Sequence, residues 1–133
     1  MPRFLHVLTG VHAIGAVVCL VMAVGSLVSA DFREGLGVSG GSRIMLRWFG
    51  EWTWAFLAGI GVVLGVLAYG SWRVRWWAWP LTLVVYGIGV SGSLWQVSVG
   101  IRQGWAAAVV NGAVFVYAST PAVRRAYLGK RTR

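Results

Sequence analysis

The chain is poor in the residue types from which active sites and metal centres are built. Its 133 residues include three acids, two histidines and one cysteine, Cys19. A single cysteine excludes an intramolecular disulfide, and so few ligands cannot form a Cys/His metal cluster. The acids, Asp31, Glu34 and Glu51, all fall between the first two apolar runs, so nucleophile, base and acid sets are also lacking. We therefore expect a protein that is not an enzyme and that binds no metal and no cofactor.

Charge of either sign is scarce. Charged residues make up 11% of the chain and hydrophobic residues 58%, and the mean hydropathy is +0.72. So few charges cannot cover the surface of a water-soluble globule of this size, which places the chain in a lipid bilayer. A net charge of +9 is typical of nucleic-acid binders among soluble proteins, but here the basic residues form short clusters between apolar runs. We expect no nucleic-acid partner.

Four windows between charged residues are each long enough for the ~20 residues that a helix needs to cross a bilayer. We predict an all-α membrane protein, a single domain over 1–133, with four transmembrane helices in an antiparallel bundle. The expected spans are about 4–30, 50–72, 77–100 and 103–120, with an outer loop at 31–47 and a tail at 121–133. The first window also resembles a secretory signal ending at Val28-Ser29-Ala30, but its apolar run exceeds the usual ~7–15 residues.

The basic residues are divided unequally between the two sides of the membrane that these spans define. Eight lie on the side of both termini and of the turn containing Arg73 and Arg75, and four lie on the other side with all three acids. By the positive-inside rule both termini are expected in the cytoplasm. Arginine outnumbers lysine eleven to one, a composition typical of GC-rich bacterial genomes. The predicted location is the cytoplasmic, or inner, membrane of a bacterium.

The nine tryptophans fall at the ends of the predicted spans, at the depth where indole rings and arginines settle in a bilayer. The predicted interface anchors are Trp72, Arg73, Arg75, Trp76, Trp77 and Trp79 on the inner side, and Trp48, Trp52, Trp54, Trp95 and Trp105 on the outer side.

The tail has the pattern of a short basic amphipathic helix. Its apolar residues fall on one helical face, and Thr120-Pro121 is a typical helix start. We expect it to lie on anionic lipids of the inner leaflet, each basic residue contributing on the order of 1 kcal/mol. The predicted headgroup contacts are Arg124, Arg125, Lys130 and Arg131.

Small residues recur at four-residue spacing, which allows helix backbones to approach closely in lipid. This pattern predicts packing within the bundle or a seam between copies in a homo-oligomer. The positions are Gly61 and Gly65 in the second span, Gly87 with Ser91 and Gly89 with Ser93 in the third, and Gly104, Ala108 and Gly112 in the fourth.

His12 is the ionisable side chain that lies well inside a predicted span, and such residues are functional candidates. Tyr86 lies at a comparable depth in the third span, and Asn111 lies nearer mid-membrane in the fourth. His12, Tyr86 and Asn111 therefore form a candidate intramembrane polar site. The alternatives are a neutral histidine bonded to a carbonyl or to Tyr86, a proton acceptor, a quinone contact, or an axial porphyrin ligand. His6 lies about 240° around the helix from His12, so the two histidines cannot ligate one porphyrin together.

Gly35–Gly40 matches G-x-G-x-x-G, but no strand precedes it and no helix follows it, so we interpret it as a flexible outer loop.

Two segments resemble a widespread class of small four-span bacterial inner-membrane proteins of unknown function. The stretch Tyr69–Pro80 is similar to its inner turn, G-x-W-x-x-R-x-W-A-W, and Pro121–Ala126 is similar to its tail, P-x-V-R-R-A. The resemblance covers the last two spans and the turn. It implies the same architecture and carries over no catalytic residue. The long glycine-rich outer loop departs from the shorter loops of that class.

The sequence favours an integral membrane protein that acts as a small scaffold or accessory subunit through helix contacts. Its expected partners are the bilayer and a homo-oligomer or a larger membrane complex. The alternative is a binder or transporter of a small lipophilic molecule, a quinone or a lipid, around His12. A third hypothesis is a porphyrin-carrying subunit.

Overall fold

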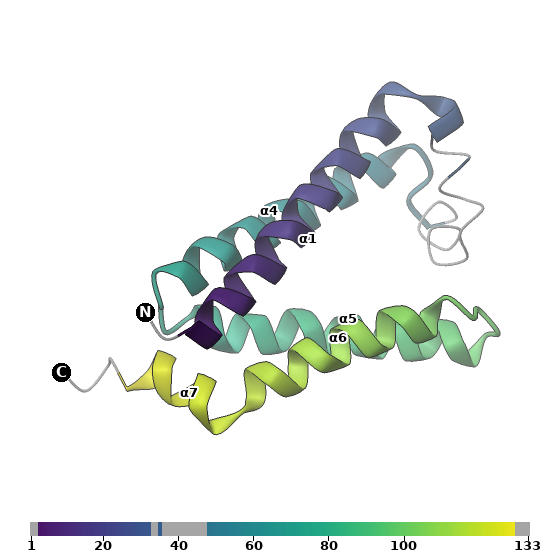
Figure 1. Cartoon of the computed structure of the whole chain (residues 1–133). Coiled ribbons are helices and arrows are strands. Elements are labelled where there is room, and N and C mark those ends of the chain that lie inside the picture. The colour runs from purple at the N-terminus through teal and green to yellow at the C-terminus, as the bar shows by residue number, and fades with distance from the viewer. Residues whose placement is uncertain (1–2, 33–34, 36–47, 130–133) are drawn as a thin grey trace.

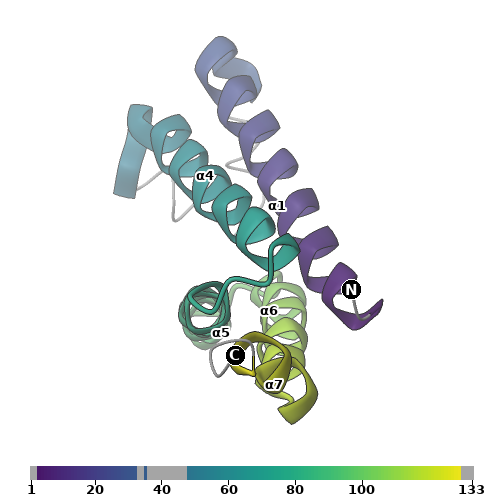
Figure 2. The same cartoon turned by 90° about the vertical axis from the view of Figure 1, so that its left-hand side faces the viewer.

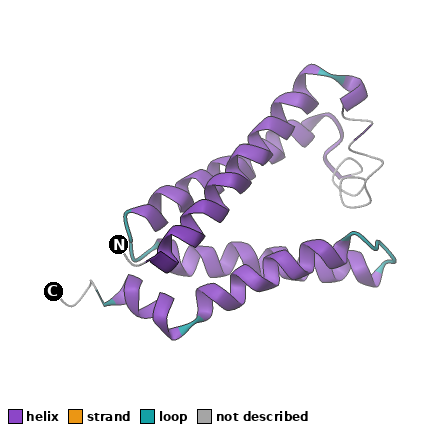
Figure 3. Cartoon of the chain, in the orientation of Figure 1, coloured by secondary structure: helices purple, strands orange, loops and turns teal. Residues whose placement is uncertain are grey.

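A computed structural model describes residues 3–32, 35 and 48–129, and the regular structure in these residues is helical throughout (Figure 3). This confirms the predicted all-α class. The elements are α1 (Arg3–Val28), the short 3-10 helix η1 (Gly50–Trp52), α4 (Thr53–Trp72), α5 (Ala78–Ser98), α6 (Gly104–Ser119) and α7 (Pro121–Leu128). Most of the expected outer loop, including the rest of the G-x-G-x-x-G match after Gly35, lies outside the described residues, as do Lys130 and Arg131 of the tail.

Three helices are long and apolar enough to cross a membrane, at His6–Val28, Gly50–Trp72 and Ala78–Ser98. The expected fourth span is a shorter helix, because α6 has only 16 residues. Helices α6 and α7 taken together are also long and apolar enough to cross a membrane, but the pair is bent by 59° between them. The described residues therefore contain three candidate spans, or four if the bent pair counts as one.

The bend between α6 and α7 follows from Pro121. The residue before a proline is driven out of the helical conformation, and Thr120 is extended, with φ −60° and ψ 143°. Pro121 then occupies the first turn of α7, where its missing N–H costs no hydrogen bond. The amphipathic tail helix that the sequence predicts is thus present over residues 121–128.

The helices form two hairpins instead of the expected single bundle. Helix α1 packs along α4, and α5 packs along α6. Figures 1 and 2 show that the two pairs meet at the end where α4 connects to α5 and diverge towards the other end. The termini of the described chain lie at the end where the pairs meet, which we call the junction.

The sharp connection between α4 and α5 brings the hairpins together. Val74 adopts a left-handed conformation, with φ 50°, and the Arg75 N–H donates to the Gly70 carbonyl over 2.8 Å, as in a helix-ending Schellman turn. This conformation is unfavourable for valine, but the Val74 side chain is buried. A Cβ on Gly70 would lie 2.6 Å from the Trp77 ring. Only glycine allows α5 to start this close to α4.

Small residues hold each hairpin together internally. A Cβ on Gly61 of α4 would lie 2.8 Å from Leu20 Cγ and 3.3 Å from the Ala16 carbonyl oxygen of α1. In the second hairpin, a Cβ on Gly104 would lie 2.8 Å from the Ser93 carbonyl oxygen. The predicted packing within the chain is therefore found at these positions, and also at Gly89, which faces Asn111. Other positions of the small-residue pattern do not lie in such a close contact. An added Cβ on Gly65 or Gly112 would meet no atom within 4 Å, and Ser91 is exposed.

The main apolar cluster lies at the junction and receives side chains from both hairpins and from α7. Its buried members are Leu8, Val74, Ala78, Tyr86, Val114, Val123 and Tyr127. The apolar face of α7 is thus turned against the protein, whereas the sequence alone suggested contact with lipid.

Replacing Gly61 with valine tests the α1–α4 contact. We expect Gly61→Val to destabilise the hairpin by about 1–3 kcal/mol, because the added methyl groups overpack a closed interface. Unfolding on heating is followed by a thiol-reactive dye, since the half-buried Cys19 is the only cysteine in the chain. Gly65→Val is the matched control, because it adds the same side chain where no atom lies within 4 Å. Equal unfolding midpoints for the two variants would contradict this packing.

Candidate functional site

His12 lies at the centre of a buried polar cluster. The buried face of α1 runs through Leu8, His12 and Ala16 at four-residue spacing, which points all three at the rest of the protein. His12 is completely buried, with 0% of its surface exposed. Its Nδ1 lies 3.3 Å from the hydroxyl oxygen of Ser71 at the end of α4, and the tautomer of the ring decides which of the two donates.

Tyr86 of α5 packs beside the histidine. The two ring centroids are 5.6 Å apart with planes tilted by 37°, and Tyr86 is buried. The predicted proximity of His12 and Tyr86 is therefore present. The site draws on both hairpins, because α1 and α4 supply His12 and Ser71 and α5 supplies Tyr86.

Tyr127 of α7 closes the cluster from the side of the C-terminus. Only 1% of its surface is exposed. Burial raises the pKa of the Tyr127 phenol, and the Ser71 hydroxyl opposes part of that rise. The phenol oxygen nevertheless has no partner of good hydrogen-bond geometry among the described residues. Ser71 thus lies between the side chains of His12 and Tyr127.

Two buried polar atoms at the junction, His12 Nε2 and the Tyr127 hydroxyl oxygen, have no hydrogen-bond partner within the described chain. Leaving such a group unpaired costs about 1–3 kcal/mol, so most buried polar groups are paired. Both atoms belong to the polar cluster where α1, α4 and α7 meet, so this cluster is the candidate site. The arrangement offers donors and acceptors of hydrogen bonds and an imidazole.

Asn111 does not join this cluster. Its amide nitrogen donates to the Ala107 carbonyl over 2.8 Å, and its side chain faces Gly89 in the α5–α6 seam. Sequence reasoning placed Asn111 by depth alone, and depth does not decide the direction of a side chain. It missed Ser71, which falls near the end of the predicted span 50–72, and Tyr127, which belongs to the tail that was expected to lie on lipid.

Cys19, two helical turns from His12, packs instead with Leu64 and Leu67 of α4. Within residues 3–32, 35 and 48–129, no group of three His, Cys, Asp or Glu side chains is placed to hold a metal ion.

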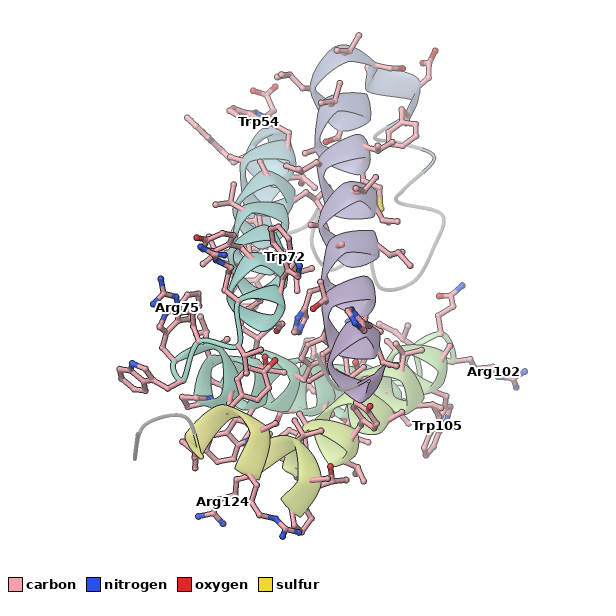
Figure 4. The ribbon with its side chains drawn as sticks, turned by 60° about the vertical axis from the view of Figure 1, so that its left-hand side comes forward. Trp54, Trp72, Arg75, Arg102, Trp105 and Arg124 are labelled. Atoms are coloured by element: carbon pink, nitrogen blue, oxygen red, sulfur yellow. The ribbon has the colours of Figure 1, made fainter. Side chains whose placement is uncertain are left out.

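The predicted interface anchors divide into two groups. Trp72 and Trp76 are exposed near the junction, as are Arg73 and Arg75. Trp77 and Trp79 instead pack against the junction cluster, and Trp79 Nε1 donates to the Ala118 carbonyl over 2.9 Å. Figure 4 shows Trp72, Arg75 and Arg124 nearer the junction and Trp54, Arg102 and Trp105 at the far ends of the hairpins. Four tryptophans away from the junction are exposed, namely Trp48, Trp52, Trp95 and Trp105.

Comparisons of the chain with protein-family models, with curated proteins and with solved structures found no match.

Truncating Tyr127 tests whether its ring holds α7 against the junction. Tyr127→Ala removes a buried aromatic ring, a change that costs about 3–5 kcal/mol in protein cores, and we expect α7 to separate from the cluster. Trypsin cleavage after Arg124 and Arg125 should then become faster. Tyr127→Phe is the control, because it keeps the ring and removes only the unpaired hydroxyl, and its cleavage rate should match that of the unmodified protein. Fast cleavage of both variants would assign the contact to the hydroxyl.

Proposed function

We propose that this chain is a non-enzymatic membrane protein that acts as a small scaffold or accessory subunit by packing against a further transmembrane helix. The observation that supports this is a stripe on α5. Leu81 and Val85 pack against the cluster formed by α1 and α4. The same helical face continues through Ile88, Gly92 and Trp95, at alternating spacings of three and four residues.

The second half of this stripe is unpartnered within the described chain. Ile88 is 69% exposed, Trp95 is 50% exposed, and no atom lies within 4 Å of the position of a Cβ on Gly92. The two hairpins diverge towards this end of α5, as Figure 1 shows. Helices associate in lipid through close backbone approach at small residues and not through the hydrophobic effect. An apolar stripe with a central glycine suits one more helix, from a second copy or from another membrane protein.

The distribution of charge supports a cytoplasmic location for the junction. The exposed Arg73, Arg75, Arg124 and Arg125 lie there, and the acids Asp31 and Glu51 lie at the other end of the α1–α4 hairpin. By the positive-inside rule the junction faces the cytoplasm, with both termini on that side of a bacterial inner membrane. The class of uncharacterised four-span proteins that the turn and tail resemble is proposed as its family.

Site-specific photo-crosslinking in native membranes tests the α5 stripe. A photo-reactive residue at Ile88 should give a discrete adduct, with a second copy or with another membrane protein. The matched control carries the same residue at Leu94, which is 49% exposed and lies on another face of α5. Equal adducts at both positions, or none at either, would contradict the proposal.

A second candidate function, binding of a small lipophilic molecule such as a quinone, is favoured by the unpaired Nε2 of His12. Native mass spectrometry of protein extracted in mild detergent should then detect a retained small molecule. We expect His12→Phe to abolish retention, because it keeps the ring volume and removes the polar atoms. Asn111→Ala, which alters a polar residue outside the cluster, should retain the molecule. Retention by His12→Phe would exclude this function, and a visible absorption spectrum of the same sample tests for a porphyrin.

A further inference from the structure

Helix α4 carries a second apolar stripe that lies exposed on the described structure. Gly59, Val62, Val66 and Tyr69 follow one another at alternating spacings of three and four residues, which places them on one face of the helix. Val62 is 59% exposed and Val66 is 46% exposed, and no atom lies within 4 Å of the position of a Cβ on Gly59. This face is turned away from α1, because the buried Leu64 lies on the opposite side of α4. We call these four residues the α4 stripe.

The α4 stripe matches the uncovered half of the α5 stripe in depth. Gly59 lies six residues after Thr53, where α4 starts, and Gly92 lies six residues before Ser98, where α5 ends. Both of these helix ends lie away from the junction (Figure 1). At a rise of about 1.5 Å per residue, each glycine is about 9 Å below its helix end. Two copies that are inserted in the same orientation therefore have these glycines at one level, with α4 of one copy antiparallel to α5 of the other.

The residues on either side of the two glycines are complementary in size. Trp95 lies three residues before the end of α5, and Ala55 lies at the same level, two residues after the start of α4. On the other side of the glycines, Ile88 of α5 is within one residue of the level of Val62. A large side chain thus meets a small one, and the backbones can approach closely at the glycines, which is how helices pack in lipid.

Opposite charges flank the two stripes at the ends of the hairpins away from the junction. The exposed Glu51 lies just before α4, and the exposed Arg102 lies just after α5. When α5 lies against α4 of a second copy, Arg102 of one chain comes to the region of Glu51 of the other. A contact between the α5 stripes of two copies would instead bring two Arg102 side chains to the same end. Charge therefore favours α4 as the partner of α5.

The two stripes cannot meet within one chain. Leu81 and Val85, the first half of the α5 stripe, pack against the cluster that contains Leu64 and Leu67 of α4. That cluster lies on the side of α4 opposite to the α4 stripe. A smaller angle between the hairpins would press α5 more closely onto this same side. A contact between the α5 stripe and the α4 stripe therefore requires a second chain.

We propose that the helix that covers the α5 stripe is α4 of a second copy of this chain, and that the two copies are related by a two-fold axis along the membrane normal. Each copy then contributes its α4 stripe and its α5 stripe. The same contact forms twice, no stripe is left over, and the assembly closes at two chains. This inference rests on the helix–helix contact proposed above and specifies its partner.

Disulfide formation between two differently tagged copies in native membranes tests this pairing. Every variant carries Cys19→Ser, which removes the natural cysteine. One copy carries Gly59→Cys and the other Gly92→Cys, two positions with room for a side chain, so a disulfide that joins the two tags joins two chains. We expect mild oxidation to form it. The matched control pairs Gly59→Cys with Leu94→Cys, at nearly the same depth on another face of α5. It should give at least about tenfold less product, because Cα atoms more than about 7 Å apart cannot be bridged.

Charge reversal provides a second arm on the same cysteine pair. Glu51→Arg alone or Arg102→Glu alone should lower the disulfide yield by up to about fivefold, the upper range for an exposed ion pair. The double variant Glu51→Arg/Arg102→Glu, made in both copies, should restore the yield because opposite charges again meet. Losses that add in the double variant, instead of cancelling, would contradict the pairing of these two residues and overturn the proposed register.

The remaining outcomes separate this proposal from the more general one. Equal yields for the Gly92→Cys and Leu94→Cys partners, or no disulfide with either, would overturn the second-copy assignment. A higher yield between two copies that both carry Gly92→Cys would also overturn it, since the contact would then join α5 to α5. If the copies form no disulfide and the photo-adduct at Ile88 contains another membrane protein, the scaffold function stands and only the assignment of its partner is wrong.

Discussion

The burial of Val74 is the contact on which the arrangement of this chain depends. A β-branched residue in the left-handed region is unfavourable by itself. Burial of the Val74 side chain in the cluster that also contains Ala78, Val123 and Tyr127 offsets that cost. That conformation turns the chain from α4 into α5 within a few residues. It also sets the relative direction of the two hairpins and the surface to which α7 binds. The junction is therefore both a packing core and a hinge point between the hairpins.

The polar cluster carries a free-energy cost, because two of its buried polar atoms lack a hydrogen-bond partner among the described residues. His12 and Tyr127 lie among buried aliphatic and aromatic side chains, and each has one polar atom without a partner. An apolar replacement at either position would remove a penalty of about 1–3 kcal/mol. Helix packing alone gives no reason for a histidine at position 12, since the neighbouring positions of the same face are Leu8 and Ala16. This cost is the physical reason to connect the cluster with binding.

Sequence patterns predicted the helices well and their assembly less well. Apolar windows bounded by charge located α1, α4 and α5, and Thr120-Pro121 located the start of α7, because these features act through local rules. The divergence of the hairpins depends on Val74 and Gly70, whose conformation and close approach are tertiary properties. Depth was the basis for grouping both Tyr86 and Asn111 with His12. Tyr86 packs beside His12, whereas Asn111 faces Gly89, because depth does not determine the direction of a side chain.

Helix α7 connects two features that the sequence treats as separate. Its eight residues present Val123 and Tyr127 to the junction on one face and Arg124 and Arg125 to the surroundings on the other. Ser71 lies near both Tyr127 and His12, so the docking of α7 and the packing of the polar cluster involve neighbouring side chains.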